Sequence, residues 1–332
     1  MNYARKRCPL ALPAVSWAVG AWLGLSSALA EVRIGGREYV RMGDWAKANN
    51  LQLRWTKRDE VLELTNLGWH LRFEVHSPEA SLNGVRVRLL FPLAQHDGSV
   101  MLSALDAQTT FRPVLSPLRS SHSGTINSIC LDPGHGGKDP GYRVGSNQEK
   151  RYNLLLAQEL RDQLTKAGWK VSLTRAVDAY VELPERPELA RRRNADLFLS
   201  LHFNATETSR GSVQGAEVYC LTPAGAPSTN SRGEGAGAGW FTGNLRNDRN
   251  MFLAYQLQKA LTRDLGMEDR GVHRARFAVL RGATMPAALI EAGFMSHPAE
   301  GQKIFTAEYR RQIARAIVEG LNAYRKATQA SN

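Results

Sequence analysis

Four side chains of the types that bind metal ions or transfer protons stand at the ends of segments with regular apolar patterns. His135, His202 and Glu291 come at or shortly after short apolar runs, and Glu149 stands just before a long amphipathic one. Two histidines and one carboxylate are a common ligand set of catalytic zinc sites, which keep one position open for water. A further carboxylate near that water can act as a general base. Together the four residues predict a zinc-dependent hydrolytic site.

Two other interpretations of this pattern fit less well. Residues 132–137 are rich in glycine and could form a phosphate-binding loop, but no Gly-Lys-Ser/Thr sequence follows them. The His-Glu-x-x-His helix of many metalloproteases does not occur in the sequence. A single histidine at a strand end is more often structural than a ligand, so the metal site is inferred from the four residues jointly.

The segments that must position these residues alternate between strand-like and helix-like patterns from residue 128 onward. This alternation predicts an α/β fold, with a mixed sheet flanked by helices. We expect strands over 128–131, 170–173, 196–201, 216–221, 277–280 and 287–290, and helices over 153–166, 182–193, 249–265 and 307–327. Side chains at the carboxyl ends of strands gather at one edge of such a sheet. The fold would therefore bring the four residues together.

Residues 31–115 follow a different pattern and predict a small, mostly β domain ahead of the α/β domain. Their short runs alternate apolar and polar residues, as half-buried strands do. Asn83-Gly84 between two such runs predicts a hairpin turn, and Asp44 is expected to cap a short helix. Residues 116–127 are rich in Ser, Pro and Gly, which is typical of a linker.

Residues 1–30 have the features of a secretory signal peptide. A basic cluster at 5–7 precedes an apolar run over 10–29, which ends in an Ala-x-Ala pattern at Ala30. The rival interpretation is an uncleaved anchor, because the run is just long enough to span a bilayer. We favour cleavage after Ala30, which would place a chain without a transmembrane segment in the periplasm or cell envelope.

The net charge of +12, from 43 Lys+Arg and 31 Asp+Glu, leaves nucleic acid, membrane surfaces and acidic polymers open as partners. Export excludes nucleic acid, and residues 119–332 hold most of the remaining charge, with 29 basic and 21 acidic residues. Three cysteines exclude a disulfide scaffold. Cys130 and Cys220 are expected to be buried small apolar residues, although export would allow them to pair.

Four separate motifs resemble those of the zinc-dependent N-acetylmuramoyl-L-alanine amidases of the amidase-3 family. They are LDPGHGGKDPG (131–141), EKRYNL (149–154), SLHFNA (200–205) and a last group made of RGV (270–272), VLR (279–281) and MPAALIEAGF (285–294). They follow the family's order within residues 126–327, and we place the catalytic domain at 128–327. The stretch SLNGVRV (81–87) and the Asp44 helix resemble the N-terminal-like domain of copper amine oxidases, which is fused to some secreted cell-wall enzymes.

The resemblance implies that His135, Glu149 and His202 hold one Zn²⁺ per chain and that Glu291 is the catalytic carboxylate. The implied reaction is hydrolysis of the peptidoglycan amide between N-acetylmuramic acid and L-alanine of the stem peptide. Zinc would lower the pKa of its water, and Glu291 would take that proton. A non-catalytic wall-binding or regulatory protein on the same fold, and a zinc peptidase that cuts within the stem peptide, stay open as alternatives.

Several neighbouring residues have a functional and a structural interpretation. Asp132 could orient a ligand histidine or cap a turn, Asn204 could polarise the substrate or cap a turn, and Arg281 could meet a stem-peptide carboxylate or lie solvated at the rim. His273 and His297 are expected to be structural.

The Gly-, Ser- and Ala-rich stretch at 222–247 predicts a long surface loop. Trp240 and Phe241 within it are either exposed loop aromatics or a lip that contacts sugar or peptide. In some relatives an inserted helix covers the zinc and supplies an inhibiting carboxylate. The glycine content disfavours such a helix here, so we expect no inhibition of that type. Residues 31–115 could bind the wall or an activating partner.

Overall fold

The computed structural model describes residues 31–119, 126–230, 235 and 239–329. The predicted signal peptide at 1–30 and part of the predicted linker at 116–127 lie outside these residues. Within the described part of the chain, no helix is long and apolar enough to cross a membrane.

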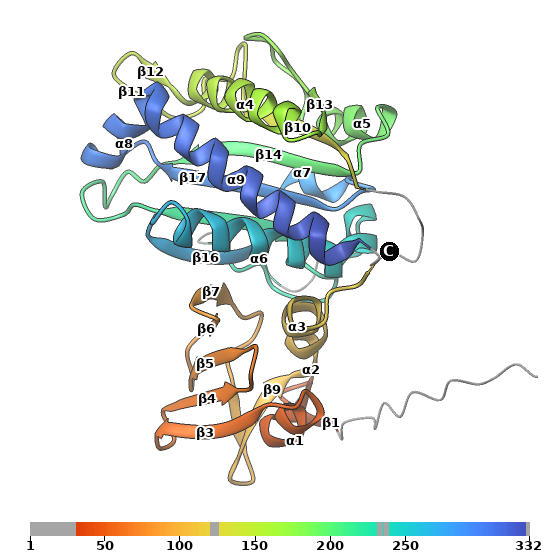
Figure 1. Ribbon diagram of the computed structural model, residues 1–332. Helices are drawn as coiled ribbons and strands as arrows, with labels where there is room; N and C mark the ends of the chain where they lie inside the picture. Colours follow the sequence, from red (N-terminus) through yellow and green to blue (C-terminus); the bar gives the residue numbers. More distant parts are fainter. Residues whose placement is uncertain (1–30, 120–125, 231–234, 236–238, 330–332) are drawn as a thin grey trace, which may run out of the picture.

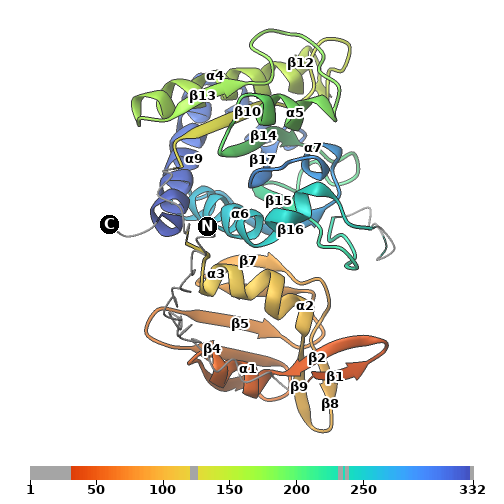
Figure 2. The same cartoon turned by 90° about the vertical axis from the view of Figure 1, so that its right-hand side faces the viewer.

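An eleven-stranded mixed sheet runs through the whole molecule (Figures 1 and 2). In spatial order its strands are β13 (Lys170–Leu173), β10 (Ser128–Pro133), β14 (Leu197–Asn204), β17 (Ala287–Phe294), β15 (Ala216–Leu221), β16 (Asp269–Ala275), β7 (Val85–Arg88), β6 (Glu79–Leu82), β5 (His70–Glu74), β4 (Val61–Thr65) and β3 (Gln52–Lys57). The first four strands are parallel, β15 is antiparallel to β17, and β16 is parallel to β15. The predicted fold class is confirmed.

Helices cover both faces of the α/β part of this sheet (Figure 1). The long helices α4 (Glu149–Lys166), α6 (Asn247–Arg263) and α9 (Ala307–Thr328) pack on one face, where Leu131, Leu199 and Ile290 point into the larger core. The short helices α5 (Glu185–Arg192) and α7 (Ala278–Arg281) pack on the other face against Phe198 and Leu289. The alternation of side chains along each strand separates the two cores.

The N-terminal part, residues 31–115, adds a second sheet and three short helices. The sheet has the order β1 (Glu31–Ile34), β2 (Arg37–Arg41), β9 (Ser99–Ser103), β8 (Ala94–His96), and the helices are α1 (Met42–Ala48), α2 (Ala104–Asp106) and α3 (Arg112–Leu115). A π-helical turn, Ala107–Phe111, joins α2 to α3. Asn83 and Gly84 have φ angles of 47° and 78°, so they form the tight turn predicted for them.

The N-terminal part is joined directly to the α/β part through the sheet. Val87 of β7 pairs with Val272 of β16 in a parallel bridge. Gly271 allows this approach, because a Cβ atom there would lie 3.2 Å from the Arg86 carbonyl oxygen. The Arg86 amide donates to Asp269 Oδ2 at 2.7 Å. Residues 31–115 are therefore β-rich as predicted, and they also cover an edge of the larger domain.

Two local predictions were wrong, and one strand was missed. Residues 277–280 do not form a strand: helix α7 begins after Phe277, and so short an apolar run does not distinguish the two structures. Asp44 lies inside the first turn of α1 and does not cap it, since the N-cap is Arg41. The strand β16 was not predicted, because arginine and histidine interrupt its apolar pattern.

The stretch at 222–247 is not entirely a surface loop. Ala226 is fully buried against Leu90 and Phe91 of the N-terminal part. Thr222 Oγ1 and Ser228 Oγ lie 2.8 Å apart and share a hydrogen bond. Among its described residues up to 246, the regular structure is a single 3₁₀ helix, Thr242–Arg246.

Candidate metal and catalytic site

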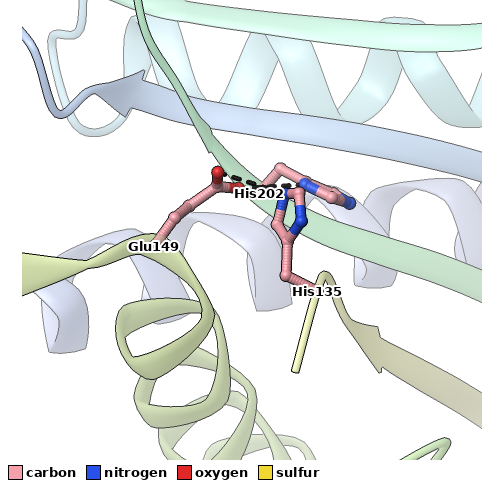
Figure 3. Close-up of side chains that lie close together, drawn as sticks. All are labelled: His135, Glu149 and His202. Carbon is pink, nitrogen blue, oxygen red and sulfur yellow. Dashed lines mark hydrogen bonds and ion pairs between the residues drawn. The ribbon is translucent and has the colours of Figure 1, made fainter. Parts of the chain in front are cut away.

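Three predicted ligands converge from three different elements (Figure 3). His135 follows β10, Glu149 is the first residue of α4, and His202 lies near the end of β14. One ligand atom from each lies within 4.8 Å of the others. His135 Nε2 is 3.1 Å from Glu149 Oε2, and His202 Nδ1 is 3.0 Å from Glu149 Oε1. The side chains thus face a common point.

The chemistry of this cluster fits a zinc ion. Imidazole nitrogens and a carboxylate are ordinary zinc ligands. Burial alone would raise the pKa of Glu149, but hydrogen bonds from His135 and His202 hold it well below its usual range. Burial lowers the pKa of His135, whereas its bonds to Glu149 and Asp139 outweigh this effect and raise it. The Glu149 carboxylate lies between two imidazole rings. A divalent cation could bind at this point and replace the protons that these groups now share.

Asp139 orients the first of these histidines. His135 Nδ1 and Asp139 Oδ2 are 2.7 Å apart, so the other ring nitrogen, Nε2, is left to face Glu149. His135 itself has a φ of 61°, in the left-handed region that disfavours side chains other than glycine. The surrounding contacts must therefore hold this residue in place.

Of the two interpretations of Asp132, the one in which it orients a ligand histidine is wrong. Asp132 is fully buried, and its oxygens accept from Thr174 Oγ1 at 2.6 Å, Ser200 Oγ at 2.8 Å and Arg186 Nη1 at 3.0 Å. Asp132 lies on β10 in register with Ser200 of β14, so its side chain meets that of its strand neighbour. The following turn carries Asp139, and not Asp132, back to His135.

Two arginines that sequence reasoning missed hold the turn after β10. Arg175 Nη2 donates to the Gly134 carbonyl at 2.8 Å, and Arg186 Nη2 donates to the His135 carbonyl at 3.0 Å. Gly134 is required for the close approach of His202, since a Cβ atom would lie 2.2 Å from that ring. No local pattern marks these arginines, because their partners lie about forty residues or more away in the chain.

Glu291 lies on the same face as His202, its partner residue across the β14–β17 ladder. The residue is largely buried, and its Oε2 atom has no hydrogen-bond partner within the described residues. Burial, together with the negative charges of Glu149 and Glu217, raises the pKa of Glu291 well above its usual range. A buried, unpartnered carboxyl group of this kind is available to bind and release a proton.

Glu217 is a second carboxylate beside the site, which sequence reasoning also missed. It faces Glu291 across the antiparallel β15–β17 ladder. Its oxygens accept from Arg270 Nε at 2.6 Å, Tyr219 OH at 2.7 Å and Asn204 Nδ2 at 3.1 Å. In the sequence, a glutamate within an apolar run that predicts a buried strand was the signal that could have identified it. Asn204 is thus placed beside Glu217, and its action on substrate stays a prediction.

The remaining candidates lie elsewhere. Arg281 is exposed at the end of α7, where its Nε donates to the Arg276 carbonyl at 2.6 Å. Its guanidinium carbon lies 5.2 Å from the centroid of the half-buried Phe241 ring. The adjacent Trp240 is exposed. The structure does not bring Arg281 into the ligand cluster, and a lip formed by the two aromatics stays a prediction.

Two histidines and two cysteines have structural surroundings, as predicted. His273 is buried with its Nε2 atom 2.9 Å from the Arg270 carbonyl oxygen. His297 is the N-cap of α8 (Pro298–Phe305), and its side chain accepts from the Glu300 amide. Cys130 and Cys220 are both buried and free.

Comparison with known proteins gives one consistent result. A family model described as N-acetylmuramoyl-L-alanine amidase matches residues 129–323, more than half of the chain. This match lies outside residues 31–115, so the resemblance of that region to copper amine oxidases stays a prediction.

Curated relatives and solved structures carry the same description. The N-acetylmuramoyl-L-alanine amidase AmiC of Neisseria meningitidis is 36% identical over 220 residues, which are 59% of this chain and 52% of that protein. AmiA of Escherichia coli is 30% identical over 230 residues, 62% of this chain and 78% of that protein. This chain thus spans about half the length of the first relative. A crystal structure of an N-acetylmuramoyl-L-alanine amidase from Clostridium difficile 630 matches with a TM-score of 0.51 and 31% identity, over 60% of this chain and 97% of that chain.

Proposed function

This chain belongs to the N-acetylmuramoyl-L-alanine amidase family, and from that premise we propose that it hydrolyses peptidoglycan. The bond cut is the amide between the lactyl group of N-acetylmuramic acid and L-alanine of the stem peptide. The observation that carries this proposal is the convergence of His135, Glu149 and His202 beside Glu291, whose Oε2 atom has no hydrogen-bond partner within the described residues.

His135, Glu149 and His202 would hold one zinc ion, which when bound supplies a Lewis acid that polarises the scissile carbonyl. Glu291 would supply the proton transfers: in its carboxylate form, Oε2 accepts a proton from the attacking water and returns it to the departing amine. Glu217 cannot share this role, because three donors already occupy its oxygens. Asp139 keeps the His135 ring in the orientation that turns Nε2 toward Glu149, where both would bind the ion.

One assay tests the reaction. The purified zinc-loaded protein is incubated with peptidoglycan, and the soluble products are identified by mass spectrometry. We expect glycan fragments with free lactyl carboxyl groups together with stem peptides that begin with L-alanine. Cuts within the stem peptide would instead identify a zinc peptidase. Absence of any product from the zinc-loaded protein would identify a non-catalytic wall-binding or regulatory protein.

We further propose that the chain works in the periplasm or cell envelope after cleavage behind Ala30. The basic charge of residues 119–332 suits an anionic wall polymer, with an on-rate that falls as salt rises. Amino-terminal sequencing of the exported protein tests this, since a first residue other than Glu31 contradicts the cleavage site.

The proposed organisation is a β-rich module at 31–115, a linker at 116–127 and a catalytic domain at 128–327 that carries the 222–247 stretch. The module is a candidate contact for the wall or for an activating partner, and the glycine-rich stretch leaves the site without an inhibiting helix. Deletion of residues 231–238 tests the latter point. Unchanged activity is expected, and a several-fold gain in activity would contradict it.

A further inference from the structure

Arg270, the second residue of β16, has a partly exposed side chain that pairs with Glu217, the residue opposite Glu291. Its Nε atom donates to Glu217 Oε1 at 2.6 Å, and its guanidinium carbon lies 5.0 Å from the centroid of the Phe294 ring. The side chain keeps 31% of its surface exposed. Within the described part of the chain, neither terminal Nη atom donates to a protein acceptor. Glu217 and Phe294 thus fix the guanidinium group, and its terminal Nη atoms are available to donate hydrogen bonds to a ligand.

The order of the strands places this group near Glu291. Strand β15 separates β17 from β16, and Glu217 on β15 lies opposite Glu291. Neighbouring strands are about 4.8 Å apart, so the backbones of β16 and β17, which carry Arg270 and Glu291, lie about 10 Å apart. An extended peptide advances about 3.3–3.6 Å per residue. This separation matches the second or third residue beyond a scissile amide held at Glu291.

The chemistry of the open group selects an anion. A guanidinium offers two parallel N–H donors that match the two oxygens of a carboxylate. Because Glu217 and Phe294 already fix the orientation of Arg270, little side-chain freedom remains to be lost on binding. The neighbouring carboxylates of Glu149 and Glu217 would otherwise repel an anionic substrate at this position.

Other arginines near the site lack these properties. Arg175 and Arg186 donate to backbone carbonyls around the His135 turn and are buried. Arg281 lies over Phe241 at the end of α7 and has no described contact with Glu217. Arg270 is the arginine that the β15–β17 ladder connects to Glu291.

We propose, resting on the amidase function above, that Arg270 binds a free carboxylate on the second or third residue of the stem peptide. The enzyme would then prefer stem peptides that carry this carboxylate over those in which it is amidated. Arg270 thereby determines specificity, whereas Glu291 performs the proton transfer.

The test compares a muramoyl tetrapeptide with free carboxylates on residues two and three against two forms, each with one of them converted to a carboxamide. For the wild type, amidation of the carboxylate that Arg270 binds should lower kcat/KM about tenfold or more, mainly through KM. Arg270→Gln should cleave all three forms at similar kcat/KM, and Arg270→Lys should keep part of the preference. Arg315→Gln, on the exposed side of α9, is the matched control and should discriminate like the wild type.

The deciding quantity is the ratio of kcat/KM between the free and the amidated peptides. A general loss of activity, caused when Glu217 loses its partner, does not change this ratio. Equal cleavage of all three forms by the wild type, or a preference that survives Arg270→Gln, overturns the proposal. A preference lost in Arg281→Gln and kept in Arg270→Gln also overturns it.

A binding measurement separates this proposal from the proposed reaction. Calorimetric titration of zinc-loaded Glu291→Gln with the same three peptides reports carboxylate binding without turnover. If the wild type cleaves none of the peptides, the reaction is wrong, and the calorimetric preference still decides the carboxylate site. Equal affinities for the three forms in that titration refute the site.

Discussion

Glu217 and Glu291 lie directly opposite each other on the antiparallel strands β15 and β17, and their surroundings treat the two carboxyl groups in opposite ways. Glu217 receives three hydrogen bonds, one of them from an arginine. Glu291 Oε2 receives none within the described residues. The surroundings thus fix the carboxylate of Glu217 by hydrogen bonds and leave an oxygen of Glu291, the proposed proton-transfer residue, without one.

Glu291→Gln should abolish most of the activity and leave the fold intact. Loss of a general acid–base group lowers rates by about 10² to 10⁴-fold. The free energy of unfolding should stay equal or rise, because the substitution removes a buried ionisable group without a partner. Activity on peptidoglycan, bound zinc and urea unfolding are measured beside Glu319→Gln, an exposed control on α9. Retained activity would remove Glu291 from its assigned role.

Glu217→Gln should have the reverse profile, with a clear loss of stability and a smaller loss of activity. The substitution weakens a charge-assisted hydrogen bond and leaves Arg270 without its anion, which should lower the free energy of unfolding by about 1.5–3 kcal/mol. Chemical denaturation of this variant and of Glu291→Gln gives the comparison. A Glu217 variant as stable as the wild type would contradict the structural assignment.

Asp139→Asn should weaken zinc binding while the protein remains folded. The carboxylate fixes the His135 ring from 2.7 Å, and loss of such a partner lowers metal affinity about 10- to 100-fold. Competition with a chromophoric chelator measures the zinc Kd directly. Asp162→Asn, on the exposed side of α4, serves as the matched control. An unchanged Kd would show that the His135 orientation is set by the turn alone.

Asp106 should make the stability of the N-terminal part depend on pH. Burial raises its pKa to about 6, although the Leu90 and Phe91 amides and the Thr110 hydroxyl donate to it. Since an unfolded aspartate has a pKa near 3.9, the folded state binds the proton more tightly. The protonated Asp106 therefore adds about 3 kcal/mol to the free energy of unfolding below about pH 4, and this contribution is lost as the pH rises through 6.

Asp106→Asn isolates this effect because it cannot titrate. The unfolding free energy of the wild type, minus that of the variant, should fall between pH 4 and pH 7. Urea denaturation of both proteins across this range measures it. A difference that does not change with pH would show that the carboxyl group is ionised throughout.

Removal of residues 31–118 should cause aggregation. The deletion exposes the edge of β16 at Val272 and the surface that Tyr255 presents to the Leu82 carbonyl, and an uncovered edge pairs readily with other chains. Size-exclusion chromatography of the fragment is compared with that of a chain that lacks only residues 1–30. A monomeric fragment with full activity would show that the N-terminal part is dispensable for the sheet.

The sequence by itself determined the chemistry of the proposed ligands and their order in the chain. His135, His202 and Glu291 follow or end apolar runs, and a strand end is a local property that periodicity reveals. Asn83-Gly84 likewise determined its own turn, because two residues with positive φ suffice for it.

Only the tertiary structure decided which side chains support these ligands. The pairing of Glu217 with Glu291, the hold of Arg186 on the His135 carbonyl and the bridge from Val87 to Val272 join residues far apart in the chain. Such contacts depend on strand order and register, which the packing of the whole core sets and no local pattern records. The lack of a partner for Glu291 Oε2 among the described residues has the same origin, since it is a property of the folded surroundings.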